Sequence, residues 1–253
     1  MFSLAATGLS NMRYLISLLG LCAACLGGTT IGTATVETLQ VGIAAGGGGL
    51  SKTSLVAWYD FDDATDAHGT YDLTEVNTPT YTSGYGTAAA TGNKLWTQNT
   101  VDGVWAPNSS TDATLVIRIR PYTGIVNGDY AFLDTSNGFQ VRHITTTGAR
   151  IRLAQASDIQ TTTVMSAGTW YLFVVEFDYA TTDHTCWVND GSGTTVSAAF
   201  TAATVGFNIG GPNATTGENF DIDYIGMFNR KLTSDERTWL YNSGGTRTYA
   251  ELD

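Results

Sequence analysis

The sequence is poor in charged residues, proline and cysteine. Charged residues make up only 14% of its 253 positions, and it contains 4 prolines and 3 cysteines. It carries 12 Lys and Arg against 23 Asp and Glu, so its formal net charge is −11. Nucleic-acid binding needs basic patches, and we exclude that class of partner. The cysteines, Cys22, Cys25 and Cys186, provide neither a disulfide framework nor the two ligand pairs of a zinc site.

Glycine and apolar residues are abundant instead. There are 29 glycines, and 43% of the residues are hydrophobic, which is enough for a core. This composition is typical of an all-β, turn-rich protein that is extracellular or built into an assembly. The acidic balance fits cation binding, and it equally fits a soluble surface.

The first part of the chain differs from the rest. Residues 14–36 contain no charged side chain, but the most apolar part, Leu15–Leu26, is short for a membrane span, so we do not expect a membrane partner. It has the size of a signal-peptide hydrophobic region, or of a segment buried between subunits. The glycine run Gly46–Gly49 then forms a flexible joint. We therefore expect an N-terminal anchor or assembly segment, 1–50, and a domain, 51–253.

From Leu55 onward, apolar and polar residues alternate in short runs. The run TLVIRIR places Leu115, Ile117 and Ile119 on one face of a strand and Arg118 on the other. Such runs recur with Gly and Asn between them, which indicates an antiparallel sandwich.

The stretch FDIDYIGMF near the C-terminus raises a question. Strict alternation puts Asp223 on the same face as Ile225 and Met227, and Ile222 with Tyr224 on the other face. A lone carboxylate among apolar side chains is unfavourable. Either that face is wet, or a positive group meets Asp223.

One helix follows this strand. Thr233 and Glu236 form the T-x-x-E pattern of a capping box, which predicts the helix start. Trp239 and Leu240 give the helix an apolar side, and Gly244 can end it in left-handed conformation. We expect the helix to lie on the sandwich and to bury Trp239 in the core.

Three stretches, 55–74, 168–191 and 222–244, together resemble the laminin-G-like branch of the concanavalin A-like lectin/glucanase superfamily. They correspond to the opening strand with its acidic loop, the paired central strands, and the closing strand with its helix. The resemblance covers residues 55–245. It implies an all-β fold, an antiparallel two-sheet jelly-roll sandwich with one short C-terminal helix.

The resemblance also implies a structural calcium ion. In the family, the acidic loop after the first strand and an Asp on the last strand meet and hold Ca²⁺. Here Asp66 and Asp223 match those positions, with Asp62 and the His68 carbonyl as neighbours. Calcium takes six to eight oxygen ligands, including carboxylates and backbone carbonyls. The alternative is that the acidic loop is only a solvated turn.

The superfamily includes glucanases, whose chemistry needs two carboxylates that face each other across the glycosidic bond. The chain has Glu176 and Asp178 on one strand, but Ala180 and Thr181 stand where the second Glu would be. We therefore expect no hydrolase activity and no enzyme.

Two classes of function remain open. The first is a glycan-binding module for cell-surface glycans, since sugars bind exposed aromatic faces with polar groups nearby. Its candidate platforms are the aromatic residues of turn-rich stretches: Tyr81, Tyr85, Trp96, Trp105 and Tyr122.

The second is a virion surface or structural protein, because the anchor-like N-terminus, the glycine joint and a single laminin-G-like module resemble decoration or fibre proteins of tailed phages. Residues 1–50 would then contact neighbouring subunits. The alternative is a secreted or lipid-anchored bacterial lectin-like protein, outside the cell or on its surface. In that case the N-terminus is processed.

Overall fold

The computed structural model of the chain describes part of its length. The described residues are 49–253 without 70, 77, 83, 90–95, 99–110, 122–128, 136–139, 145–147, 154–156, 198–206 and 211–218. All of them belong to one compact unit, Ala44–Asp253. The anchor expected at 1–50 lies outside the described residues except for its end, so the boundary at residue 50 stays a prediction.

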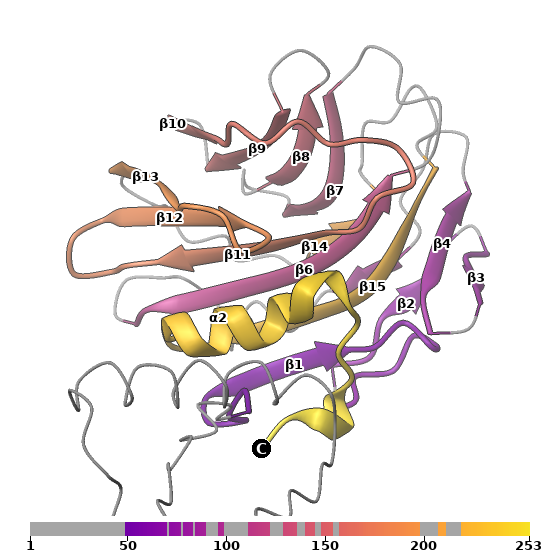
Figure 1. The fold of residues 1–253 in the computed structure, drawn as a ribbon. Helices are drawn as coiled ribbons and strands as arrows, with labels where there is room; N and C mark the ends of the chain where they lie inside the picture. Colours follow the sequence, from indigo (N-terminus) through magenta and orange to yellow (C-terminus); the bar gives the residue numbers. More distant parts are fainter. Residues whose placement is uncertain are drawn as a thin grey trace, which may run out of the picture. The chain divides into compact units, whose positions relative to one another are not determined.

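The described residues form two antiparallel sheets and one short α-helix near the C-terminus, as expected (Figure 1). In spatial order, the larger sheet contains β13 (Thr194–Ser197), β12 (Asp183–Val188), β11 (Tyr171–Phe177), β6 (Ala113–Pro121), β15 (Asn219–Phe228), β4 (Gly86–Ala89) and β3 (Thr80–Tyr81), with β1 (Leu55–Tyr59) also paired to β15. The smaller sheet contains β10 (Ser157–Gln160), β9 (Gly148–Leu153), β8 (Gln140–Ile144), β7 (Asp129–Thr135), β14 (Phe207–Ile209), β5 (Trp96–Gln98) and β2 (Thr74–Glu75). The expected two-sheet antiparallel sandwich is confirmed.

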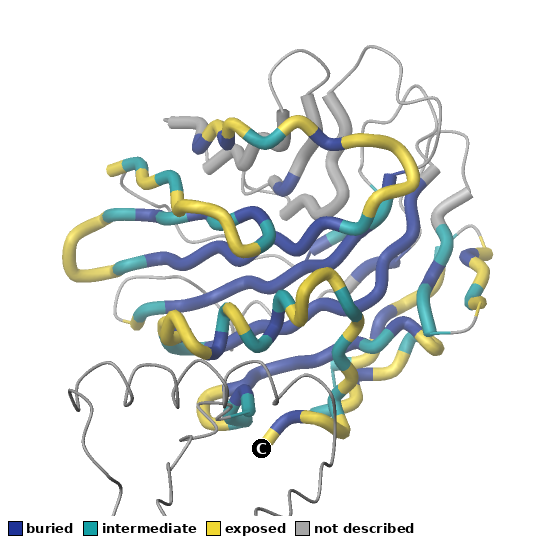
Figure 2. Tube along the Cα trace, viewed as in Figure 1, coloured by how far each residue is buried: buried dark blue, intermediate teal, exposed yellow. Residues whose placement is uncertain are grey.

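The main core lies between the two sheets. On β6, alternation directs Leu115, Ile117 and Ile119 into this core, as expected, and Phe173 of the neighbouring β11 pairs with Ile117. On β12, Cys186 is completely buried in the same core. The central strands β6, β11 and β15 are therefore buried along nearly all of their described length (Figure 2).

A second apolar cluster covers the outer face of the larger sheet. Trp58 of β1 stacks on Tyr224 of β15, with ring centroids 5.1 Å apart. Gly226 makes room for that ring, because an added Cβ would stand 2.6 Å from Trp58 Cζ3. Helix α2 (Ser234–Tyr241) adds Leu240, which is fully buried. The expectation that Trp239 enters the core is wrong, because Leu240 takes that place and Trp239 is only half-buried.

The ends of α2 follow from local chemistry. The capping box of Thr233 and Glu236 is present as expected. The helix ends two residues before Gly244, at Asn242, which adopts the left-handed conformation with φ 45°. A 3-10 turn, η2 (Asn242–Gly244), follows, and a second one, η3 (Tyr249–Glu251), precedes the C-terminus. Within the described residues, no helix is both long and apolar enough to cross a bilayer.

The expected alternation of β15 is wrong at Asp223. The register of β15 against β6 shifts between Ile222 and Tyr224, so Asp223 is the extra residue of a β-bulge. Ile222 therefore lies in the inter-sheet core together with Ile225, and Tyr224 lies in the outer cluster. The bulge moves Asp223 away from the apolar face and onto the outer face of the sheet.

Candidate binding pocket

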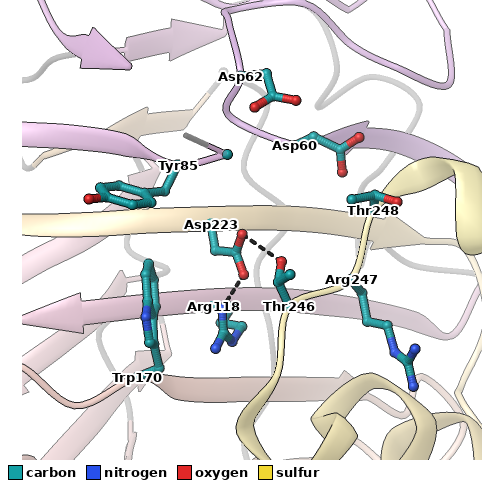
Figure 3. A pocket seen from close by; sticks show the side chains of 10 residues that line it. Asp60, Asp62, Tyr85, Arg118, Trp170, Asp223, Thr246, Arg247 and Thr248 are labelled. Carbon is teal, nitrogen blue, oxygen red and sulfur yellow. Dashed lines mark hydrogen bonds and ion pairs between the residues drawn. The ribbon is translucent and has the colours of Figure 1, made fainter. Parts of the chain in front are cut away.

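A pocket of about 340 Å³ opens on the outer face of the larger sheet (Figure 3). Its walls come from β6, β15, the loops that follow β1 and β3, the residue before β11, and the C-terminal segment. Ten residues line it: Asp60, Asp62, Gly84, Tyr85, Arg118, Trp170, Asp223, Thr246, Arg247 and Thr248. Pockets for small ligands usually measure about 300–1,000 Å³, so this one suits a small ligand.

An ion pair lies at the centre of the pocket. Arg118 of β6 pairs with Asp223 of β15, and the side chains of both residues are almost completely buried. Thr246 Oγ1 donates a hydrogen bond of 2.8 Å to Asp223 Oδ1 (Figure 3). Burial raises the pKa of Asp223, although Arg118 and Thr246 act to lower it. A positive group thus meets Asp223, which is one of the two arrangements that its sequence context required.

Two aromatic rings form one wall. Tyr85 and Trp170 meet edge to face, with ring centroids 5.9 Å apart. The Arg118 guanidinium lies 4.4 Å from the Trp170 centroid, and that of Arg120 lies 4.7 Å from it. Arg120 also lies over Tyr85 and pairs with Asp221. These contacts hold both rings in place, and both remain partly exposed.

Two further carboxylates, Asp60 and Asp62, also line the pocket. Asp60 accepts hydrogen bonds from Trp58 Nε1 at 2.6 Å and from the Tyr249 backbone N–H at 3.0 Å. Burial raises the pKa of Asp60, against those two hydrogen bonds, which lower it. Asp62 is exposed at the rim, where it lies near Gly84.

The residues expected to bind calcium have other contacts in this structure. Asp66 is buried, and its carboxylate accepts hydrogen bonds from the backbone N–H groups of Trp58, His68 and Tyr71. Asp223, by contrast, pairs with Arg118. Asp66 thus organises the loop after β1, and its two oxygens already have donors.

His68 places its ring 3.1 Å from the Tyr249 hydroxyl, measured from Nδ1. No group of three or more His, Cys, Asp or Glu in the described part of the chain could hold a metal ion. The described arrangement of Asp62, Asp66, His68 and Asp223 therefore does not fit a shared calcium ion. Calcium binding at these residues stays a prediction.

The expected aromatic platforms divide into three groups. Tyr85 lines the pocket. Trp96 is fully buried and donates through Nε1 to the Tyr81 hydroxyl, so Trp96 packs the core and its ring presents no face to solvent. Trp105 and Tyr122 lie outside the described residues.

Sequence reasoning missed Trp170, which immediately precedes β11. The sequence offered one signal, because Trp170 stands two residues after Gly168, and glycine favours turns.

The two carboxylates considered for hydrolysis have structural contacts. Glu176 is buried and accepts hydrogen bonds from Arg237 Nη1 at 3.0 Å and from the Leu232 N–H at 3.1 Å. It therefore holds the start of α2 against the sheet. Asp178 pairs with Lys231 near the surface.

The fold resembles solved structures although the sequence matches no family model and no curated protein. Domain 4 of AbnA, an extracellular GH43 arabinanase of Geobacillus stearothermophilus solved with arabinotriose, aligns with a TM-score of 0.57 at 16% identity, covering 74% of this chain and 98% of that domain. Trypanosoma rangeli sialidase aligns with a TM-score of 0.62 at 16% identity, covering 93% of this chain but only 39% of the sialidase. The binding domain of botulinum neurotoxin serotype D/C gives 0.58 at 14% identity, over 77% of this chain and 53% of that one.

At these identities the likeness shows the fold alone, a β-sandwich. The pocket described above must therefore carry any argument about what this chain binds.

Proposed function

We propose that the domain is a non-enzymatic, glycan-binding module and that the pocket beside Tyr85 and Trp170 is its sugar site. The observation that carries the proposal is that two aromatic rings, held in place by arginine side chains, line one cavity together with carboxylates and threonine hydroxyls. Sugars present apolar C–H faces to such rings and hydroxyl groups to such polar side chains. Two of the similar structures were determined with a glycan ligand, arabinotriose in one and SialylT in the other.

Binding of the full-length chain to an array of neutral, amino and acidic glycans tests this proposal. We expect Tyr85→Ala to weaken the glycan affinity about tenfold or more. The variant loses one aromatic contact, and a contact of about 1.4 kcal/mol corresponds to a tenfold change in the dissociation constant. Tyr179→Ala is the matched control, because Tyr179 is exposed and is not a pocket residue. Equal losses in both variants, or no glycan binding at all, would contradict a sugar site at the pocket.

The absence of enzymatic activity is part of the proposal. Glu176 and Asp178 are engaged with Arg237 and Lys231, so neither is placed as a free acid or nucleophile. We expect no turnover of β-glucans by the full-length chain. Turnover that disappears in Glu176→Gln, while the thermal stability of that variant is retained, would refute this part.

A structural role in a larger particle, at a virion surface, is the wider context that we propose for this module. Its basis remains the uncharged run at 14–36 and the glycine joint, both read from the sequence. The alternative is a secreted or lipid-anchored bacterial lectin. Mass spectrometry of the native protein separates the two, since a mature N-terminus at Cys25 or a lipid on it would indicate export.

Calcium is tested separately. Elemental analysis of the purified chain and melting with and without EDTA measure it directly. A ligand at a hundred times its dissociation constant adds about 2.7 kcal/mol to the free energy of unfolding. A calcium-bound fold should therefore melt several degrees lower in EDTA, whereas no shift and no bound calcium would rule the ion out.

A further inference from the structure

The charges around the pocket do not balance. Arg118 is paired with Asp223 inside it. Arg247 donates through Nη1 to Glu251 Oε1 at 3.1 Å and stacks on Trp239 at 3.9 Å, and its guanidinium points away from Asp223 (Figure 3). Both cationic side chains of the pocket lining are therefore neutralised by a carboxylate of their own.

The remaining pocket carboxylates have no cationic partner among the described residues. The donors to Asp60, an indole N–H and a backbone N–H, are both neutral. Asp62 is exposed, and it makes no hydrogen bond or ion pair to the described part of the chain. The pocket thus carries an excess of negative charge in a chain whose net charge is −11.

We propose that the pocket selects a saccharide that carries an ammonium group, an amino sugar, and rejects sialic and uronic acids. This inference rests on the glycan-binding function proposed above. The two aromatic rings contact the sugar face, and the Asp62 carboxylate at the rim pairs with the ammonium group. Asp60, deeper in the pocket, adds to the negative potential but keeps its own hydrogen bonds.

Charge selection at this site does not follow from the fold. The binding domain of botulinum neurotoxin D/C shares the sandwich, and one of its structures was determined with SialylT. The two chains are only 14% identical, so the side chains of each pocket decide which glycan fits. Here an anionic sugar would approach carboxylates that no cation compensates.

Calorimetric titration of the full-length chain with three probes tests the inference: the disaccharide of glucosamine, its N-acetylated form, and sialyllactose. We expect the glucosamine disaccharide to bind at least tenfold more tightly than the N-acetylated form, and sialyllactose not to bind. The preference should decrease as salt rises from 0.05 to 0.5 M, because screening weakens exposed ion pairs.

Two variants separate site-specific pairing from general attraction to an acidic protein. Asp62→Asn should abolish the preference, so that the ratio of the affinities for the amino and N-acetylated forms falls to about one. Asp63→Asn is the matched control, since Asp63 is the exposed neighbour, accepts hydrogen bonds from Thr65 and is not a pocket residue. A preference that survives Asp62→Asn, or is lost equally in Asp63→Asn, would refute the inference.

The failure of this inference can be told from failure of the proposed function. If the N-acetylated or sialylated probe binds more tightly than the amino form, the pocket is a sugar site but its charge selection is refuted. If no saccharide binds, the proposed function itself fails, and the inference fails with it.

Discussion

The two faces of the larger sheet are stabilised by different interactions. The inner face of β6 and β11 meets the second sheet with apolar side chains, such as Ile117 and Phe173. The outer face mixes an apolar cluster around Trp58 with charged pairs, of which Arg118–Asp223 is the most buried. The inner face therefore depends on apolar area removed from water, whereas the outer face depends on each charge finding its partner.

This difference explains the position of the pocket. The inner apolar face is closed, because its side chains interdigitate with those of the second sheet at the density of a packed core. On the outer face, the C-terminal segment reaches Asp223 through Thr246, and the pocket lies where these polar groups meet. The site thus occupies the part of the sheet that packing alone does not cover.

The largest effect is expected on the inner face. Phe173→Ala should lower the free energy of unfolding by about 4 kcal/mol, because it removes a fully buried ring and leaves a cavity. Denaturant unfolding followed by tryptophan fluorescence measures the change. Val164→Ala is the control, since Val164 is 68% exposed and should cost less than about 0.5 kcal/mol. A cost below about 1 kcal/mol for Phe173→Ala would contradict the core assignment.

The outer face should respond to a broken charge pair. Arg118→Leu leaves Asp223 buried without its cation and should cost about 3 kcal/mol. The double variant Arg118→Leu/Asp223→Leu removes both charges and should recover most of that loss. If the double variant is no more stable than the single one, the pair does not act as described.

The pH dependence of the same variant sharpens the comparison. Burial already raises the pKa of Asp223 above its ordinary value, so the folded state holds this proton more tightly than the unfolded state does. Stability from this group is therefore greatest at low pH and is lost as pH rises through the raised pKa. Without Arg118 the pKa should rise further, so the penalty of Arg118→Leu should shrink on acidification. A penalty independent of pH between 4 and 7 would argue against an uncompensated Asp223.

A smaller effect is expected at the helix start. Thr233→Ala removes the side chain that accepts from the Glu236 N–H and should cost about 1 kcal/mol. Ser234→Ala, at the next position, is the control and should be nearly neutral. Thermal melting of the two variants compares them, and equal shifts would deny the capping role.

The smallest effect is expected at the surface. Lys231 pairs with Asp178 at an exposed position, and such pairs are worth less than about 1 kcal/mol. Lys231→Ala should therefore change the free energy of unfolding by less than about 0.5 kcal/mol. A larger loss would mean that this pair helps Glu176 to hold the start of α2.

Local patterns in the sequence were sufficient for much of the fold. Alternation assigned Leu115, Ile117 and Ile119 to the core, because a strand has a period of two whatever it pairs with. The capping box located the start of α2, since its hydrogen bonds join residues three apart. Of the site, the same reasoning named Asp62, Tyr85 and Asp223 but supplied no reason to join them into one pocket.

Tertiary structure alone decided the rest. The bulge at Asp223 arises where β15 must fit β6, and it reverses the face that strict alternation assigns to this carboxylate. Arg118 meets Asp223 across 105 positions of sequence, so no local pattern connects them. Leu240 is fully buried in the outer cluster and Trp239 only packs against it, because the docking of α2 decides which side chain is covered. Composition and the two-residue alternation of apolar side chains determined the sandwich and its inner face. The pocket, by contrast, exists only because distant segments, from Asp60 to Thr248, converge on one sheet.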